Sequence, residues 1–378
     1  MIHRILEDKI RQRLNKGKAI ILTGPIQVGK TTLMKQLTQE HTASTLWLTG
    51  DDPAVRALLK DVSLAMMKSI IGEHKTIVVD EAQRLHNAGL TLKLITDHLP
   101  DVQLLVTGSS SLDLMAENKE SLVGRKIEYQ LYPVSYAEMA AHHGLLTEHS
   151  QLEHRLVYGY YPEVIGSETQ RAKEILKELT DGLMYKDLLA LDQLKKPSLL
   201  VKLLQALALQ LGSEVSYNEV AQLIGADPQT VERYIDLLEQ AYVIYRLPSL
   251  SRNARNEIKK GKKVYFFDNG IRNSIINNFN PLELRQDKGA LWENFLLAER
   301  LKHNAYRRHF YSPYFWRTTG QQEIDYIEEY DGKLFAYEFK WKSPRKPRFP
   351  KTFLDAYPNS STEVITKENY HAFVGAVN

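Results

Sequence analysis

The chain has 378 residues, of which 43% are hydrophobic and 25% charged, a composition typical of a globular protein with two or three domains. It contains no cysteine, which excludes a disulfide framework and thiolate metal sites and fits a reducing compartment. The first residues lack the apolar segment of a signal peptide, and no uncharged apolar run approaches the roughly 18 residues of a membrane helix. We therefore expect a cytoplasmic protein that has no membrane partner.

The net charge of +3 hides an asymmetry along the chain. Between Arg252 and Lys351 there are 21 Lys and Arg against 12 Asp and Glu, an excess of 9, so the remainder carries −6. A basic excess is what contact with a nucleic-acid backbone requires, and it also serves as ordinary solubilising surface.

Four short, β-branched runs alternate with longer amphipathic stretches in the first part of the chain. They cover residues 19–23, 45–48, 76–79 and 103–106. Runs that are apolar at consecutive positions are typical of strands covered on both faces, as in a parallel sheet flanked by helices. The pattern predicts an α/β nucleotide-binding domain at residues 1–150.

The first run leads into a phosphate-binding pattern that stands after a strand and before a helix. The pattern and the residue after it are Gly24, Pro25, Ile26, Gln27, Val28, Gly29, Lys30, Thr31 and Thr32. Its glycines allow backbone N–H groups to surround phosphates, the lysine reaches the β- and γ-phosphates, and Thr31 ligates magnesium. The segment predicts ATP and Mg²⁺ as cofactors. The alternative is a glycine-rich turn that binds no nucleotide.

A second apolar run ends in two carboxylates, Asp80 and Glu81. The first is expected to hold the magnesium shell, and the second to orient and polarise the attacking water. Alone this pattern is weak, because many strands end in acidic turns, but with the upstream loop it predicts an ATPase.

Two further residues are candidates for the same reaction. Ser109 follows the fourth run, where a hydroxyl could position water or sense the γ-phosphate; alternatively it caps the next helix. Arg125 could act as an arginine finger towards its own nucleotide or that of a neighbouring subunit in a homo-oligomer, or it could be an ordinary surface arginine.

Residues 151–250 have a helical pattern. Ser216 with Glu219, and Asp227 with Pro228, are the start signals of two consecutive helices, and β-like residues 242–247 follow. This order predicts a winged helix. Gln229, Thr230 and Arg233 would be placed to contact base edges, whereas Glu232, Asp236 and Glu239 on the same helix would repel phosphates, which leaves protein docking as the alternative.

Residues 251–378 contain a helix at about 289–301 and two strands, at about 323–328 and 334–341, joined by the turn signal Asp331-Gly332. Glu338 and Lys340 lie two residues apart on one strand and so share a face, which Asp325 on the neighbouring strand could approach; Glu293 lies on the helix. From spacing alone, a cross-strand salt bridge between exposed Glu and Lys on a hairpin explains these residues better than a metal site does.

Several segments together resemble a large prokaryotic family of AAA+ ATPases related to the archaeal-type group. They are residues 24–32, 77–84, 107–112, 122–125 and 131–136 with Glu138, and the Gly159-Tyr160-Tyr161-Pro162-Glu163 signature, in which a tyrosine stands where phenylalanine is usual. In that family the C-terminal domain is likened to PD-(D/E)xK nucleases. The resemblance implies that Glu293, Asp325 and Glu338 are metal ligands and that Lys340 stabilises charge or orients water.

The expected function is an ATPase whose nucleotide state controls a nuclease-like region that binds double-stranded DNA or another nucleic acid. Aromatic and basic neighbours, such as Trp316-Arg317 and Trp341-Lys342, are compatible with this partner. The alternative is a nucleotide-switched signalling ATPase with a protein partner and a catalytically silent nuclease fold. An enzyme for a small phosphorylated substrate is a third hypothesis.

Overall fold

The computed structural model describes residues 1–108, 122, 124–182, 197–251, 261–342 and 349–376. The chain divides into two compact units, and each is described by itself. Unit 1 comprises Met1–Pro133 with Gln240–Tyr242, and unit 2 comprises Val134–Glu239 with Val243–Asn378. No described helix is both long enough and apolar enough to cross a membrane.

Unit 1 is built on a five-stranded parallel sheet with the order β2-β3-β4-β1-β5. Its strands are β1 (Ala19–Thr23), β2 (Thr45–Thr49), β3 (Thr76–Asp80), β4 (Gln103–Gly108) and β5 (Lys126–Gln130). The four predicted runs are therefore strands, and the predicted parallel α/β sheet is confirmed. Its helices are α1 (Ile5–Arg11), α2 (Lys30–Thr38), α3 (Pro53–Leu59), α4 (Leu64–Ile71) and α5 (Ala88–His98), with 3₁₀ turns η1 (Gln39–Ser44) and η2 (Ala82–Arg84).

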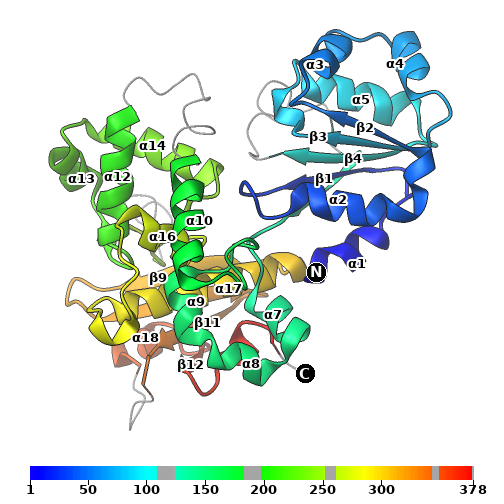
Figure 1. Ribbon diagram of the computed structural model, residues 1–378. Coiled ribbons are helices and arrows are strands. Elements are labelled where there is room, and N and C mark those ends of the chain that lie inside the picture. Colours follow the sequence, from blue (N-terminus) through cyan, green and yellow to red (C-terminus); the bar gives the residue numbers. More distant parts are fainter. Residues whose placement is uncertain (109–121, 123, 183–196, 252–260, 343–348, 377–378) are drawn as a thin grey trace. The chain divides into compact units, whose positions relative to one another are not determined.

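Helices cover both faces of this sheet, which explains why its strands are apolar at consecutive positions (Figure 1). Ala19 and Ile21 of β1 belong to the core that includes residues of α3, α4 and α5. Successive side chains of a strand point to opposite faces, so Ile20 and Leu22, which are also buried, lie on the other face of the sheet. The sheet thus holds the carboxyl ends of all five strands at one edge.

Unit 2 begins with helices and a three-stranded antiparallel sheet. The helices are α7 (Tyr136–His143), α8 (Leu145–Ser150), α9 (Leu152–Tyr158), α10 (Thr169–Gly182), α12 (Pro197–Leu209), α13 (Tyr217–Ile224) and α14 (Pro228–Gln240). The strands are β6 (Glu214–Val215), β7 (Ile244–Pro248) and β8 (Lys262–Phe266), with β8 in the middle. The predicted helix starts are confirmed, because Ser216 accepts from the Glu219 N–H and Asp227 from the Thr230 N–H.

The rest of unit 2 contains a four-stranded sheet with the order β12-β11-β10-β9, in which only the β11–β12 pair is parallel. Its strands are β9 (Ser312–Arg317), β10 (Glu323–Tyr330), β11 (Lys333–Phe339) and β12 (Ser361–Ile365). The helices are α16 (Asn269–Ile275), α17 (Lys288–Arg307), α18 (Lys351–Ala356) and α19 (Tyr370–Phe373), with the 3₁₀ turn η4 (Leu282–Leu284). A parallel bridge between Ser249 and Phe315 joins this sheet to the three-stranded one.

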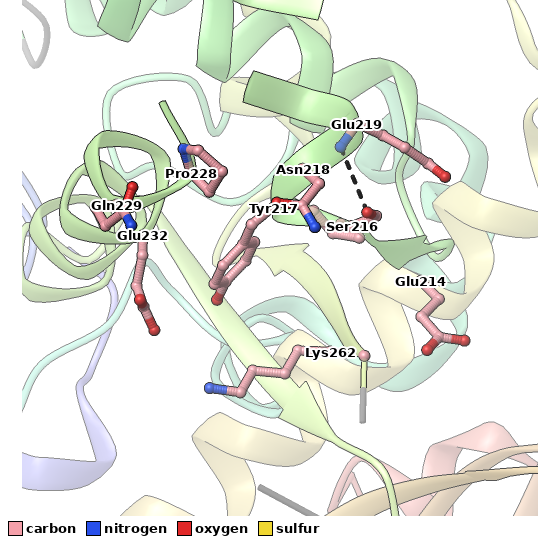
Figure 2. A pocket seen from close by; sticks show the side chains of 11 residues that line it. Glu214, Ser216, Tyr217, Asn218, Glu219, Pro228, Gln229, Glu232 and Lys262 are labelled. Carbon is pink, nitrogen blue, oxygen red and sulfur yellow. Dashed lines mark hydrogen bonds between the residues drawn. The ribbon is translucent and has the colours of Figure 1, made fainter. Parts of the chain in front are cut away.

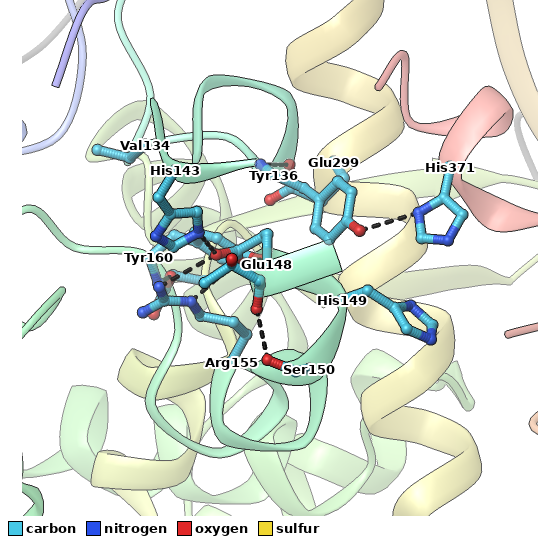
Figure 3. A network of polar contacts seen from close by, with 12 residues as sticks. Val134, Tyr136, His143, Glu148, His149, Ser150, Arg155, Tyr160, Glu299 and His371 are labelled. Atoms are coloured by element: carbon cyan, nitrogen blue, oxygen red, sulfur yellow. Dashed lines mark hydrogen bonds and ion pairs between the residues drawn. The ribbon is translucent and has the colours of Figure 1, made fainter. Parts of the chain in front are cut away.

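A buried polar network fastens the first helices of unit 2 (Figure 3). Glu148 is fully buried; it accepts hydrogen bonds from Arg155 (3.0 Å) and Tyr160 (2.6 Å) and pairs with His143 (2.8 Å). The Tyr136 N–H donates to Glu299 of α17 at 2.7 Å. Helices α7 and α8 lie before residue 150, in the predicted ATPase domain, but their contacts group them with unit 2, and unit 1 ends at Pro133.

Candidate functional site

The phosphate-binding loop runs from the end of β1 to the start of α2. Gly24 has a φ of +147°, and a Cβ there would lie 2.0 Å from the carbonyl oxygen of Leu131, so only glycine fits this close approach of two backbones. Gly29 is the N-cap of α2, and Lys30 is its first residue. The local sequence thus bends the backbone tightly and directs free N–H groups of a helix N-terminus into the loop.

Two buried cations hold this loop. Lys30 is 5% exposed, and its ammonium donates to the carbonyl oxygens of Gly24 (2.9 Å) and Pro25 (2.7 Å). Arg4 donates to the carbonyl oxygens of Val28 (2.8 Å) and Tyr132 (2.7 Å). Arg4 therefore connects the loop to the segment that follows β5, a role that no sequence motif indicated.

The carboxylate of Asp80 accepts hydrogen bonds from two hydroxyl groups. The Thr31 hydroxyl donates to Asp80 Oδ2 at 2.9 Å, and the Thr107 hydroxyl donates to Asp80 Oδ1. The Thr107 oxygen also accepts from the Glu81 N–H at 3.1 Å. The structure therefore brings together three predicted residues, Thr31, Asp80 and Glu81, at the carboxyl edge of the sheet, and adds Thr107.

Glu81 has a left-handed backbone with a φ of +51°, which is uncommon for a non-glycine residue. The Gln83 amide donates to Glu81 Oε2 at 2.6 Å. A Cβ on Gly50 would lie 2.3 Å from the Glu81 carbonyl oxygen, so the end of β2 leaves room for this turn only because residue 50 is glycine. Strained backbone of this kind is frequent at functional sites.

This set of residues fits Mg²⁺-ATP. An ammonium and helix N–H groups suit phosphate oxygens, and magnesium prefers one or two protein oxygen ligands together with phosphates and water. Lys30 and the loop N–H groups would hold the phosphates, while Thr31 and Asp80 would hold the magnesium shell.

Two further residues, Ser109 and Arg125, were predicted to take part in ATP hydrolysis. Ser109 lies outside the described residues. Arg125 precedes β5, whose Lys126 pairs with Ala19 at the start of β1, so it lies at the amino edge of the sheet, opposite Lys30. It also pairs with Asp97. An arginine finger towards its own nucleotide does not fit this topology, and one towards a neighbouring subunit stays a prediction.

The carboxylates predicted in the C-terminal part lie on α17, β10 and β11. Glu293 of α17 accepts from the Tyr265 hydroxyl, and its Oε1 lies 3.2 Å from the ammonium of Lys263. Burial, and to a lesser extent the nearby Asp325 carboxylate, raise the pKa of Glu293 to about 7, although Lys263 opposes this shift. Tyr265 and Lys263 belong to β8, and the sequence pattern did not associate either of them with Glu293.

Asp325 and Glu338 share Lys340. The Lys340 ammonium lies 2.8 Å from Glu338 and 3.9 Å from Asp325, which also accepts from the Phe339 N–H at 2.7 Å. Burial and the Asp325 charge raise the pKa of Glu338 to about 7. The ammonium of Lys340, which contacts both carboxylates, makes Asp325 and Glu338 neighbours. In the part of the chain that the structure describes, however, no three His, Asp or Glu side chains are arranged to hold a metal ion.

The two helices α13 and α14 line an open cavity of about 710 Å³ (Figure 2). Its charged residues are three carboxylates, Glu214, Glu219 and Glu232, against the one ammonium of Lys262. Of the proposed base-contacting residues, Gln229 and Arg233 are exposed, whereas the Thr230 hydroxyl is bonded to Asp227. This face therefore carries more negative than positive charge.

Comparison with protein families divides the chain into three matched segments. The family described as "AAA domain" matches residues 16–140. Two families described as "Domain of unknown function", DUF8612 and DUF4143, match residues 149–282 and 288–374. The C-terminal match says nothing of a nuclease.

Among curated proteins, the chain is 27% identical to an uncharacterized protein of Mycobacterium tuberculosis over 342 residues, which are 88% of this chain and 72% of that protein. It is 24% identical to an uncharacterized protein of Haemophilus influenzae over 280 residues, 71% of this chain and 67% of that protein.

Among solved structures, the RuvB Holliday junction branch migration motor of Thermotoga maritima is 18% identical with a TM-score of 0.32, over 68% of this chain and 95% of that one. A DNA replication initiation factor is 16% identical with a TM-score of 0.28, over 62% and 86%. The match of residues 16–140 to the family described as "AAA domain" supports ATP binding and hydrolysis as the activity of this segment.

Proposed function

We propose that this chain hydrolyses ATP with magnesium at the carboxyl edge of the unit 1 sheet and that the bound nucleotide switches the state of unit 2. The observation that carries the first part is the continuous set of contacts from Thr31 through Asp80 and Thr107 to Glu81. In P-loop enzymes magnesium neutralises charge that develops on the phosphates, and the protein contributes positioning and electrostatics.

The residues of this chain would divide the work as follows. Lys30 binds phosphate oxygens with its ammonium, and Thr31 and Asp80 orient the metal shell. Glu81 orients the attacking water and accepts its proton at a carboxylate oxygen. Thr107 and Gln83 are positioning residues, because they bond Asp80 and Glu81.

For unit 2 we propose a winged helix followed by a fold similar to PD-(D/E)xK nucleases. The winged helix is supported by the order α12, β6, α13, α14, β7, β8, with β8 between the other two strands. The nuclease-like fold is supported by the order α17, β9, β10, β11, α18, β12 and by the neighbouring Glu293, Asp325 and Glu338. Fold likeness alone does not establish nuclease activity.

Two observations favour a protein partner and a catalytically silent nuclease-like fold. The cavity between α13 and α14 has three carboxylates and one ammonium, which would repel a phosphate backbone. The carboxylates Glu338 and Glu293 are already paired with Lys340 and Lys263. The first feature suits a surface that docks protein, and the second suits a catalytically silent fold.

A nucleic-acid partner is the second candidate. The observation in its favour is the excess of nine positive charges between Arg252 and Lys351. Part of that excess lies in residues 252–260 and 343–348, outside the described structure.

The test is magnesium-dependent ATP hydrolysis with and without double-stranded DNA, at low and moderate salt, with the DNA followed for cleavage in the same reactions. We expect hydrolysis that DNA does not stimulate, and intact DNA. Stimulation that falls steeply as salt rises, or cleavage that Glu338→Ala abolishes, would establish the nucleic-acid candidate instead. Absence of ATP hydrolysis under all conditions would contradict the first part of the proposal.

A further inference from the structure

One lysine outside the four-stranded sheet lies among the carboxylates of the nuclease-like fold. Lys263, the second residue of β8, is only 2% exposed. Its ammonium lies 3.2 Å from Glu293 Oε1, forms an ion pair with Glu323 of β10, and lies 5.4 Å from the centre of the Phe315 ring. A buried ammonium is tolerated only where negative charge and hydrogen-bond acceptors surround it, so Lys263 is an integral part of this cluster.

Donors of the chain itself occupy one oxygen of each carboxylate in the cluster. The Tyr265 hydroxyl and the Lys263 ammonium both bind Oε1 of Glu293. On the opposite side, Lys340 lies 2.8 Å from Glu338 and 3.9 Å from Asp325. Magnesium and manganese need several oxygens that converge at about 2.1 Å on one point. The described residues contain no such group, and an ammonium stands beside each of the carboxylates that would have to supply it.

We propose that Lys263, which is paired with Glu293 and Glu323, is a built-in cation that takes the place of a divalent metal ion beside the carboxylates of Glu293, Asp325 and Glu338. The inference rests on the nuclease-like fold proposed above and not on ATP hydrolysis. Lys263 also connects β8 of the three-stranded sheet with α17 and β10. The cluster then joins the two parts of unit 2 by charge pairing and performs no metal-dependent cleavage.

The experiment is a Mn²⁺ titration of the full chain, followed by the electron paramagnetic resonance signal of free Mn²⁺. Asp80→Asn is present throughout, so that the nucleotide site lacks its carboxylate metal ligand and the result does not depend on ATP hydrolysis. We expect this protein to bind no Mn²⁺ at micromolar concentrations. Lys263→Met should create one Mn²⁺ site per chain, because the competing positive charge has gone. Its affinity for Mn²⁺ should be higher than that of the protein with Lys263 by about tenfold or more. Glu293→Gln added to it should remove that site.

Lys333→Met is the matched control, since Lys333 is an exposed lysine of β11. It should create no site. The proposal would be overturned if the protein with Lys263 intact bound one Mn²⁺ per chain and Glu293→Gln removed that binding. This outcome can be measured even if Lys263→Met fails to fold. A folded Lys263→Met protein that gains no Mn²⁺ site would overturn it as well.

Discussion

Thr107 is the residue that connects the two carboxylates of the ATPase site. Its hydroxyl is fully buried, donates to Asp80 and accepts from the Glu81 N–H. Thr107→Val keeps the shape and removes both bonds. We expect kcat for ATP to fall about 100-fold, because small displacements of catalytic groups cost that much. ATP affinity should stay within a few-fold, since Lys30 and the loop are untouched.

Thr107→Ser is the control for this substitution, because it retains the hydroxyl and should retain most of the rate. Steady-state kinetics with a fluorescent nucleotide titration separate the two effects. An unchanged kcat in Thr107→Val would show that the hydroxyl does not position Glu81.

Gly50 permits the turn at Glu81 because it has no side chain. A Cβ at this position would lie 2.3 Å from the Glu81 carbonyl oxygen and 3.1 Å from Arg84 Cβ. Because the nearer atom belongs to backbone, Gly50→Ala must shift the Glu81 turn, and we expect hydrolysis to be lost while nucleotide binding persists. Gly289→Ala, which would meet no atom within 4 Å, should leave hydrolysis unchanged. Equal ATPase rates in the two variants would contradict this role of Gly50.

At the residue scale, sequence reasoning found the groups whose neighbours lie close by in the chain. Lys30 and Thr31 belong to one loop, and Asp80 and Glu81 are consecutive, so a local pattern identified them. The contact of Thr107 with Asp80 spans 27 residues, and that of Lys263 with Glu293 spans 30. Such contacts depend on which strands become neighbours, which no local pattern specifies.

Elements that carry their own start and stop signals were predicted well. The turn Asp331-Gly332 has two positive φ angles, +50° and +71°, as the hairpin signal required. Strand β9 was missed, because Pro313 follows Ser312 at its start and favours an irregular edge. The residues of α7 and α8 were assigned to the ATPase domain, because sequence position does not say which core a helix covers, which is set by partners such as Glu299.

The side-chain amide of Asn294 helps to attach helix α17 to β8 of the three-stranded sheet. The buried Asn294 side chain accepts from the Phe266 N–H (2.8 Å) and donates to the Phe266 carbonyl (3.0 Å) and to Asn269 (2.7 Å). Asn294→Leu leaves these buried groups without partners, and we expect the free energy of unfolding to fall by about 3 kcal/mol. Urea denaturation followed by circular dichroism measures it.

Asn280→Ala is the matched control, because Asn280 is exposed and its change should stay within about 0.5 kcal/mol. An Asn294→Leu protein as stable as this control would mean that the amide contributes nothing to the attachment of α17.

At the scale of the whole molecule, two compact units share one chain, and the proposed switch requires that nucleotide bound to unit 1 alters unit 2. Calorimetry of Glu81→Gln with Mg²⁺-ATP tests this requirement. A ligand at 100 times its Kd stabilises the state that binds it by about 2.7 kcal/mol. We expect the unfolding transitions of both units to move. A shift confined to unit 1 would show that the units are not coupled.

The claim on which the rest depends is that Asp80 and Glu81 carry out magnesium-dependent ATP hydrolysis with Lys30 and Thr31. The most direct measurement compares ATP affinity and single-turnover hydrolysis in the wild type and in Glu81→Gln, with Glu128→Gln on β5 as the control. We predict equal affinities in all three proteins and a rate that falls about 100-fold or more in Glu81→Gln alone, because general-base contributions have this size. A Glu81→Gln protein that hydrolyses ATP at the wild-type rate, or a wild type that binds no ATP, would contradict the account.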